Sequence, residues 1–407
     1  MIESRRLRLR GTLEALRGFS LRPDQKLTWL TVSVAVAFLC GLGLSWRLWI
    51  SSRLFPLSPI SDLLPPIPFP FDYLLAAVLF GSLLATVVVP HPRGLLIVFL
   101  VLAGLLSLWD QMRWQPWFYQ YFFMMAAITI CAWQKPDAKS RVVALDTWRL
   151  IVIATYFWSG AQKLNATFVN RTWADIAGPA LRFLPKGLAK LPAPVILAIP
   201  MLEIAIALGL LTRKTRRPSV IFATATHVVI LSMLISSGEN TVVWPWNAAQ
   251  IVFVWVLFWG DQNTRFFERS PASIFQAIVF LLFAVLPVLS FASRWDSYLS
   301  WALYSGNTDQ AVIYLSPAAI HYLPQEIHPH VWQERSPYFL DINRWAYGEL
   351  NVPVYPEPRV FRRVAQAICG YADSEQSGVR LRIFQKPQLL NGTRESQFYD
   401  CDHLRDP

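Results

Sequence analysis

The sequence predicts an all-α polytopic membrane protein, a bundle of about nine spans, followed by a small C-terminal α+β domain outside the membrane. The 407 residues are 54% hydrophobic and only 15% charged, with a positive mean hydropathy. Soluble proteins average about 25% charged residues. Long apolar runs recur over the first 292 positions, and a bilayer-spanning helix needs roughly 20 such residues.

The predicted spans define three parts of the chain. The spans are 28–46, 73–89, 95–109, 117–133, 150–165, 193–211, 220–235, 242–260 and 272–292. Segment 1–27 is arginine-rich and is interpreted as a cytoplasmic segment, which is compatible with an amphipathic helix on the membrane surface. Segment 28–292 is the bundle, and 293–407 is the extracytoplasmic domain.

The basic residues predict the orientation. With nine spans, the N-terminus and the loops HPRG, QKPDAKSR, RKTRR and DQNTRFFERS fall on one side. Cytoplasmic loops carry an excess of Lys and Arg, so this side is predicted to be cytoplasmic, in a plasma membrane or bacterial inner membrane. The net charge of +11 is thus explained by topology, and the bilayer rather than nucleic acid is the expected partner.

Three segments depart from plain spans. The proline-rich link 51–72 cannot form a straight helix, because proline removes backbone donors, and is expected to lie on the bundle. The insert 165–194 contains a candidate amphipathic surface helix at 172–184. The residues WPWN (244–247) are expected to break the eighth span, which is tolerated where the freed backbone lines a cavity.

The C-terminal domain shows strand and helix signals. AVIYLS (311–316) and VRLRIF (379–384) have the β-branched, alternating character of strands. PRVFRRVAQAICGY (358–371) is predicted to be a helix, with proline near its start and glycine near its end. Cys369 and Cys401 could pair in an oxidising compartment. HYLPQEIHPH (321–330) matches no strong zinc pattern, so no metal site is predicted.

The rest of the chain is organised around the stretch LIVIATYFWSGAQKLN (150–165), whose apolar run ends at Gln162 and Lys163. Lys163 has two interpretations. Its ammonium can extend to the lipid headgroups with no further role. Alternatively it points into the bundle, where partial desolvation makes a lysine a tunable base.

Two further ionisable residues lie in later spans. Glu203 falls in PMLEIAIALGLL and His227 in IFATATHVVILSML. Such residues are costly in apolar surroundings unless they face a partner or a cavity. Lys163, Glu203 and His227 are therefore candidate catalytic residues of one cluster, with a purely structural pairing as the alternative.

Several nearby side chains are candidates for contacting a ligand. The tryptophans would supply flat apolar walls, and the others polar contacts. These residues are Tyr156, Trp158, Gln162, Asn165, Trp244, Trp246 and Asn247.

YFWSGAQKLN (156–165), followed by an internal glutamate in the next span and a histidine in a later one, resembles the HTTM domain. This membrane domain is related to vitamin K-dependent gamma-carboxylase and, distantly, to DoxX-like proteins. The resemblance covers roughly 30–259 and implies that Lys163 matches the base that deprotonates reduced vitamin K. This chain is shorter than the carboxylase and its outer domain is smaller. The resemblance therefore implies a cavity for a quinone-like or lipid ligand, with a quinone or quinol as the candidate cofactor, rather than carboxylation.

Two functions remain open from the sequence. In the first, a hydrophobic small molecule enters the bundle and Lys163 acts on it. In the second, the protein is a non-enzymatic scaffold or assembly factor that meets an extracytoplasmic protein through segment 293–407. Transport has less support, because no inverted internal repeat is visible. The chain has no P-loop, GxSxG or HExxH motif, which argues against nucleotide hydrolysis and zinc peptidase chemistry.

Overall fold

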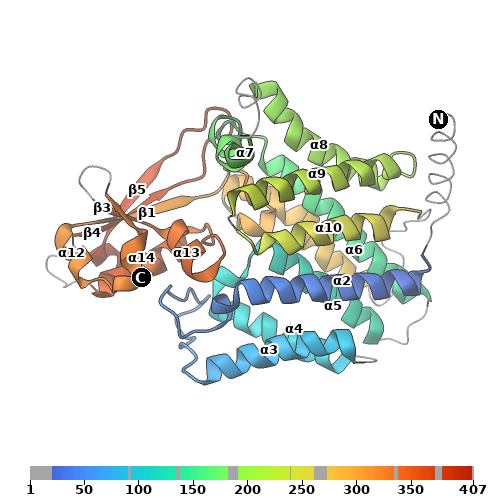
Figure 1. Ribbon diagram of the computed structural model, residues 1–407, viewed down its shortest axis with the longest axis horizontal. Helices are drawn as coiled ribbons and strands as arrows, with labels where there is room; N and C mark the ends of the chain where they lie inside the picture. Colours follow the sequence, from blue (N-terminus) through green and yellow to red (C-terminus); the bar gives the residue numbers. More distant parts are fainter. Residues whose placement is uncertain are drawn as a thin grey trace, which may run out of the picture.

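The computed structural model describes residues 21–89, 93–133, 138–181, 191–238, 240–260, 273–333, 338–371 and 378–405. Its long helices form one bundle, and the C-terminal region forms a layer across one end of that bundle (Figure 1). The amphipathic helix expected near the N-terminus lies outside the described residues.

The bundle is built from apolar helices. They are α2 (Pro23–Leu44), α3 (Phe71–Val88), α4 (Arg93–Trp109), α5 (Pro116–Trp133), α6 (Ala138–Gln162), α8 (Ala193–Leu211), α9 (Arg216–Ser237), α10 (Val243–Phe258) and α11 (Ser273–Phe280). Among the described residues, six helical stretches are long and apolar enough to cross a membrane: α2, α3, α6, α8, α9 and Ser273–Ala292. Large apolar side chains on their outer faces are exposed, such as Leu84 (56%) and Phe222 (53%). An apolar outer surface suits contact with lipid tails better than contact with water.

α6 is the centre of the bundle. Of its apolar stretch, 83% is buried, against 28–39% in the other five membrane-length stretches. The helix begins well before the predicted span, and its early charged residues are satisfied internally. Asp146 forms a buried ion pair with Arg149, and Arg149 Nε donates to the Leu257 carbonyl at 3.2 Å.

The expected break at 244–247 is wrong. α10 runs from Val243 to Phe258 without interruption, and Pro245 lies in its first turn. Proline is tolerated there because the N–H groups of the first turn have no intrahelical partner in any case. Tryptophan and asparagine side chains of this turn therefore point out from a regular helix.

The last stretch of the bundle is the irregular one. After α11 the chain changes to a π-helical turn, η4 (Leu281–Val285), and then to a 3-10 helix, η5 (Leu286–Ala292). Pro287 lies at the start of η5 and cannot donate a backbone hydrogen bond to the preceding turn, which explains the change in winding.

The described part of the C-terminal domain contains a five-stranded antiparallel sheet. Its strands are β1 (Gln310–Leu315), β2 (Val331–Gln333), β3 (Tyr338–Asp341), β4 (Val379–Phe384) and β5 (Ser396–Asp400), in the order β2-β3-β1-β4-β5. Central strand β1 pairs Ile313 with Leu340 on one side and with Leu381 on the other. All three side chains are fully buried. Helices α12 (Pro317–Tyr322), α13 (Ile342–Leu350), α14 (Pro358–Tyr371) and α15 (Cys401–Arg405) complete the domain.

The domain is held on the bundle by hydrogen bonds to several links between helices. Glu349 accepts from the backbone N–H groups of Leu54 and Phe55 at 2.7 and 2.9 Å. Asn351 donates to the carbonyl of Leu44 and to the hydroxyl of Thr241. The links after α2 and after α9 therefore lie at the same end of the bundle as the domain.

An ionisable cluster around Glu357 predicts that the stability of the protein depends on pH. Glu357 is buried and accepts from the backbone N–H of Ser297 at 2.8 Å. Burial, with Asp296 nearby, raises the pKa of Glu357 to about 7 despite the positive charges of Lys386 and Arg359. Below pH 4.5 the carboxyl is protonated in both the folded and the unfolded protein. As the pH rises to about 7, only the folded state keeps the proton, so the free energy of unfolding falls.

We therefore expect the C-terminal domain to be more stable at pH 5 than at pH 8. Denaturant unfolding at the two pH values measures the difference. In Glu357→Gln, which cannot ionise, the difference should shrink, and an unchanged difference would assign it to other groups.

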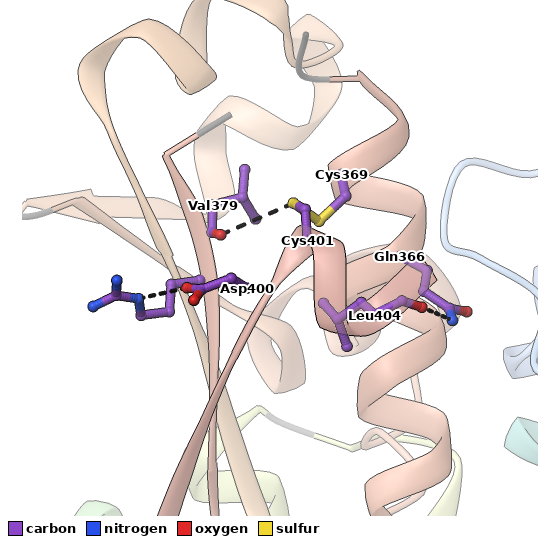
Figure 2. The surroundings of a disulfide bond; sticks show 7 residues. Gln366, Cys369, Val379, Asp400, Cys401 and Leu404 are labelled. Carbon is purple, nitrogen blue, oxygen red and sulfur yellow. Dashed lines mark hydrogen bonds and ion pairs between the residues drawn. A yellow bond between two sulfur atoms is a disulfide. The ribbon is translucent and has the colours of Figure 1, made fainter. Parts of the chain in front are cut away.

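Cys369 of α14 and Cys401 of α15 form a disulfide, shown in Figure 2, that ties the last described helix to α14. The sequence separation is 32 residues. In the chain-entropy account, a cross-link of this span stabilises the fold by about 2–4 kcal/mol.

Cys369→Ser is accordingly expected to lower the free energy of unfolding of the C-terminal domain by that amount. Denaturant unfolding under non-reducing conditions gives the value. Cys40→Ser is the matched control, because Cys40 is a free, exposed thiol, and it should unfold like the parent protein.

Candidate ligand site in the helix bundle

The site begins where α6 and α8 approach most closely. Gly160 lies against α8, so that a Cβ at this position would be 2.6 Å from the carbonyl oxygen of Pro200 and 3.1 Å from Cβ of Glu203. Only glycine allows this approach. α6 ends at Gln162, and the next residue, Lys163, is therefore placed directly beside Glu203.

Lys163 and Glu203 form a buried ion pair. The ammonium nitrogen lies 3.0 and 2.8 Å from the two carboxylate oxygens and 2.6 Å from the hydroxyl of Ser159. The side chains are 12% and 6% exposed. The carbonyl oxygen of Ser159 lies at 3.2 Å as a fourth acceptor, so all three protons of the ammonium group have partners. The interpretation in which Lys163 extends to the lipid headgroups does not fit this geometry, because the ammonium group is hydrogen-bonded to the carboxylate of Glu203.

A second chain of hydrogen bonds lies next to this pair. The hydroxyl of Tyr156 is 2.6 Å from His227 Nε2, and His227 Nδ1 is 2.8 Å from the amide oxygen of Asn247. Asn247 Nδ2 donates to the Val243 carbonyl, so its oxygen faces the ring as an acceptor. His227 must then carry a proton on Nδ1, and Nε2 accepts from Tyr156.

These groups line one small pocket inside the bundle, called the inner pocket below. Its volume is about 80 Å³. It is lined by Tyr156 and Ser159 of α6, Lys163 directly after α6, Glu203 of α8, His227 of α9, and Trp246, Asn247 and Gln250 of α10. The pocket is thus narrow and its polar groups converge, which suits the head group of a ligand rather than a whole lipid.

The inner pocket contains unused hydrogen-bonding capacity. Gln120 Oε1 accepts from both Trp246 Nε1 and Gln250 Nε2. Within the described residues, Gln250 Oε1 and Trp301 Nε1 are buried without a partner. A buried polar atom without a partner is costly, and Gln250 and Trp301 both line the inner pocket.

A larger apolar groove adjoins the inner pocket. Its volume is about 300 Å³, and it is lined by Trp173 and Ile176 of α7 (Trp173–Leu181), Leu202 of α8, and Phe222, Val229 and Met233 of α9. Lys163 and Glu203 line both spaces. Phe222 and Val229 are about half exposed, so the groove opens on the outer face of the bundle. The ion pair stands where apolar groove and polar pocket meet.

The seven candidate ligand contacts divide into two groups. Tyr156, Trp246 and Asn247 line the inner pocket. The structure places the other four in supporting roles outside it. Trp158 donates to the carbonyl of Ala284, and Gln162 accepts from Asn307. Asn165 caps the turn at Phe168 and binds the Ser305 carbonyl, and Trp244 packs against the hydrophobic core.

Some lining residues were missed by the sequence analysis. Ser159 precedes Lys163 by four residues and so shares its helix face, a signal that was available. Trp301 and Tyr304 come from the segment after the bundle, and their position depends on the tertiary fold. Within the described ranges, no group of three or more His, Cys, Asp or Glu side chains is arranged to hold a metal ion.

Comparisons with known proteins leave the family open. No family model, curated protein or solved structure matches this chain. The resemblance to the HTTM domain stays a prediction from segment 156–165, Glu203 and His227, and the functional argument rests on the geometry of the site.

Proposed function

We propose that this protein spans a membrane about nine times and binds a hydrophobic molecule with a polar head group, such as a quinone or a lipid. The N-terminus would be cytoplasmic and the C-terminal domain outside. One feature supports this orientation: the domain contacts the links after α2 and α9, which nine spans place on the outer side. The basic loops then lie at the opposite end.

The observation that carries the ligand proposal is the position of the Lys163–Glu203 pair. A buried ion pair contributes little net stability compared with apolar residues of similar size. Here it stands between an apolar groove open to the outer face of the bundle and a pocket with unpaired polar atoms. The apolar part of a ligand would occupy the groove, and its head group would reach the pair. The resemblance in segment 156–165 is the reason to test quinones first.

The pair also suggests a chemical role. A proton can pass from the ammonium of Lys163 to the carboxylate of Glu203, which leaves a neutral amine beside a neutral carboxyl. The amine can then take the proton of a ligand hydroxyl and become the counter-ion of the oxyanion that forms. His227 on the other wall bonds Asn247 and Tyr156 through its two ring nitrogens, so it would hydrogen-bond the same head group in exchange for its bond from Tyr156. Lys163 is the proposed base, Glu203 the proton acceptor and His227 the orienting residue.

The test is to identify small molecules that co-purify with the protein in its native lipids, by mass spectrometry. A quinone or other isoprenoid should be enriched with the parent protein and lost in Lys163→Ala. Lys139→Ala is the matched control, because Lys139 is an exposed lysine at the other end of α6. The same molecules with all three proteins, each folded, would contradict a ligand site at Lys163.

The alternative is a non-enzymatic scaffold acting through the outer domain. One observation favours it. On the sheet face opposite α14, Phe398 is 53% exposed and lies under the guanidinium groups of Arg380 and Arg382. In this case Phe398→Ser should abolish cellular function, while the double variant Lys163→Met with Glu203→Leu, which leaves no unpaired charge, is tolerated. The reverse result would reject the scaffold.

A further inference from the structure

A third cavity lies between the bundle and the outer domain. Its volume is about 360 Å³, and polar groups line much of it: Arg171, Tyr298, Asp309, Asp341, Asn343 and Tyr347. We call it the vestibule. Tyr298 among these residues is buried, with 5% of the residue exposed. The vestibule is therefore a polar space, unlike the apolar groove between α7, α8 and α9.

The vestibule is connected outward. A shallower hollow on the free face of the sheet is lined by Asn170, Asn391 and Arg394. Arg171, Gln310 and Val312 line both spaces. Polar solutes on the outer side of the protein can thus reach the vestibule along β1.

Inward, the vestibule ends at a thin partition. Leu303 and Tyr304 line the vestibule on one side and the inner pocket on the other. Tyr304 also borders the apolar groove, so this one side chain touches all three cavities. Behind the partition stand Lys163 and Glu203.

The backbone of the partition is held in an unfavourable conformation. Trp301 and Tyr304 have φ values of 65° and 57°, and Asn240, which donates to the hydroxyl of Tyr304, has a φ of 47°. Residues other than glycine adopt this left-handed region at a cost. A conformation of this kind persists where surrounding contacts hold it, and the Asn240 bond is one such contact.

We propose that the inner pocket has a second entrance, from the aqueous vestibule, and that Tyr304 closes it. A lipid-like ligand would enter through the apolar groove. A small, water-soluble, hydrogen-bonding molecule would approach Lys163 through the vestibule once the ring of Tyr304 moves. This inference rests on the proposed function only in taking the inner pocket as the reaction site. The entrance itself can be tested without any ligand.

The test measures thiol accessibility from the outer side. Cys40→Ser and Cys131→Ser remove the two cysteines outside the disulfide, and Thr155→Cys places a thiol in the inner pocket, where Thr155 is 7% exposed. A charged, membrane-impermeant methanethiosulfonate is then added to sealed vesicles or intact cells. With Tyr304 in place, we expect slow labelling. Tyr304→Ala should label at least about tenfold faster, the change expected when a barrier of about 1.4 kcal/mol is removed.

Two further variants keep the test interpretable. Thr308→Cys places the thiol in the vestibule and should label rapidly whether or not Tyr304 is replaced, which also reports that the fold is intact. Tyr304→Phe keeps the ring but loses the hydrogen bond from Asn240. In this variant the Thr155→Cys thiol should be labelled at a rate between those found with Tyr304 and with Tyr304→Ala.

If the Thr155→Cys thiol is labelled at the same rate with Tyr304 in place and in Tyr304→Ala, Tyr304 does not close the entrance. A Thr308→Cys thiol that resists the reagent would overturn the aqueous entrance. Neither result bears on whether Lys163→Ala loses a co-purifying lipid, so failure of this inference and failure of the proposed function are distinguishable.

Discussion

Glu203→Leu alone is expected to lower the free energy of unfolding by about 3–5 kcal/mol, because it leaves the buried ammonium of Lys163 without its counter-ion. The reverse change, Lys163→Met, strands the carboxylate of Glu203 in the same way. Both side chains are almost fully enclosed, so water can replace the missing partner only in part. Denaturant or thermal unfolding of the purified variants measures the loss.

The double variant separates structure from function. Replacing both members of a buried pair by apolar residues of similar size is often neutral or stabilising. We therefore expect Lys163→Met with Glu203→Leu to recover most of the stability while the ligand is still lost. If the double variant regains both, the pair is structural and the proposed base is wrong. If the double variant stays as unstable as the single variants, the two side chains contribute to stability through contacts other than the attraction between their charges.

The helices could be predicted well because their signals are local. The predicted span 193–211 and the predicted helix 358–371 have the same bounds as α8 and α14. The first is an unbroken apolar run, and the second has proline at its start. α6 was predicted too short because hydropathy treats Asp146 and Arg149 as polar, whereas the fold buries them as a pair.

Helical periodicity explains which site residues the sequence could locate. Tyr156, Ser159 and Lys163 follow one another at intervals of three and four, so the first two share one face of α6 and Lys163 continues it just past the end of the helix. The inner pocket lies on that face. Trp158 and Gln162 are also four apart and share a different face, directed at Ala284 and Asn307. Applying this rule to segment 150–165 would have removed both from the ligand contacts.

Other parts of the site lie beyond sequence reasoning. Trp301 and Tyr304 reach the inner pocket only because the chain after η5 turns back over the end of α6 through left-handed backbone conformations. These conformations belong to residues other than glycine, so composition gives no sign of them. The outer domain was predicted from two strands and one helix. The short strands β2, β3 and β5 gain their stability from pairing with distant segments, and propensity alone does not show this.

The distance between α6 and α8 controls the whole site, and Gly160 sets that distance. In Gly160→Ala the new methyl group would be 2.6 Å from the Pro200 carbonyl oxygen and 2.8 Å from Ile204 Cγ1. Backbone atoms cannot rotate away, so α8 must shift. Overpacking of this kind costs about 1–3 kcal/mol, and the shift separates Glu203 from Lys163. We therefore expect reduced stability together with loss of the ligand, and a larger effect for Gly160→Val.

Gly43→Ala provides the matched control for Gly160→Ala. Gly43 is also a helical glycine, and apart from its chain neighbours and the backbone of its own helix no described atom lies within 4 Å of its added Cβ. Alanine is favoured over glycine in a helix by up to about 1 kcal/mol, so this variant should be at least as stable as the parent protein and keep its ligand. If Gly160→Ala behaves in the same way, the two helices can separate without cost. The geometry of the Lys163–Glu203 pair would then depend on the side chains alone, with Ser159 as the remaining contact that holds the ammonium group in place.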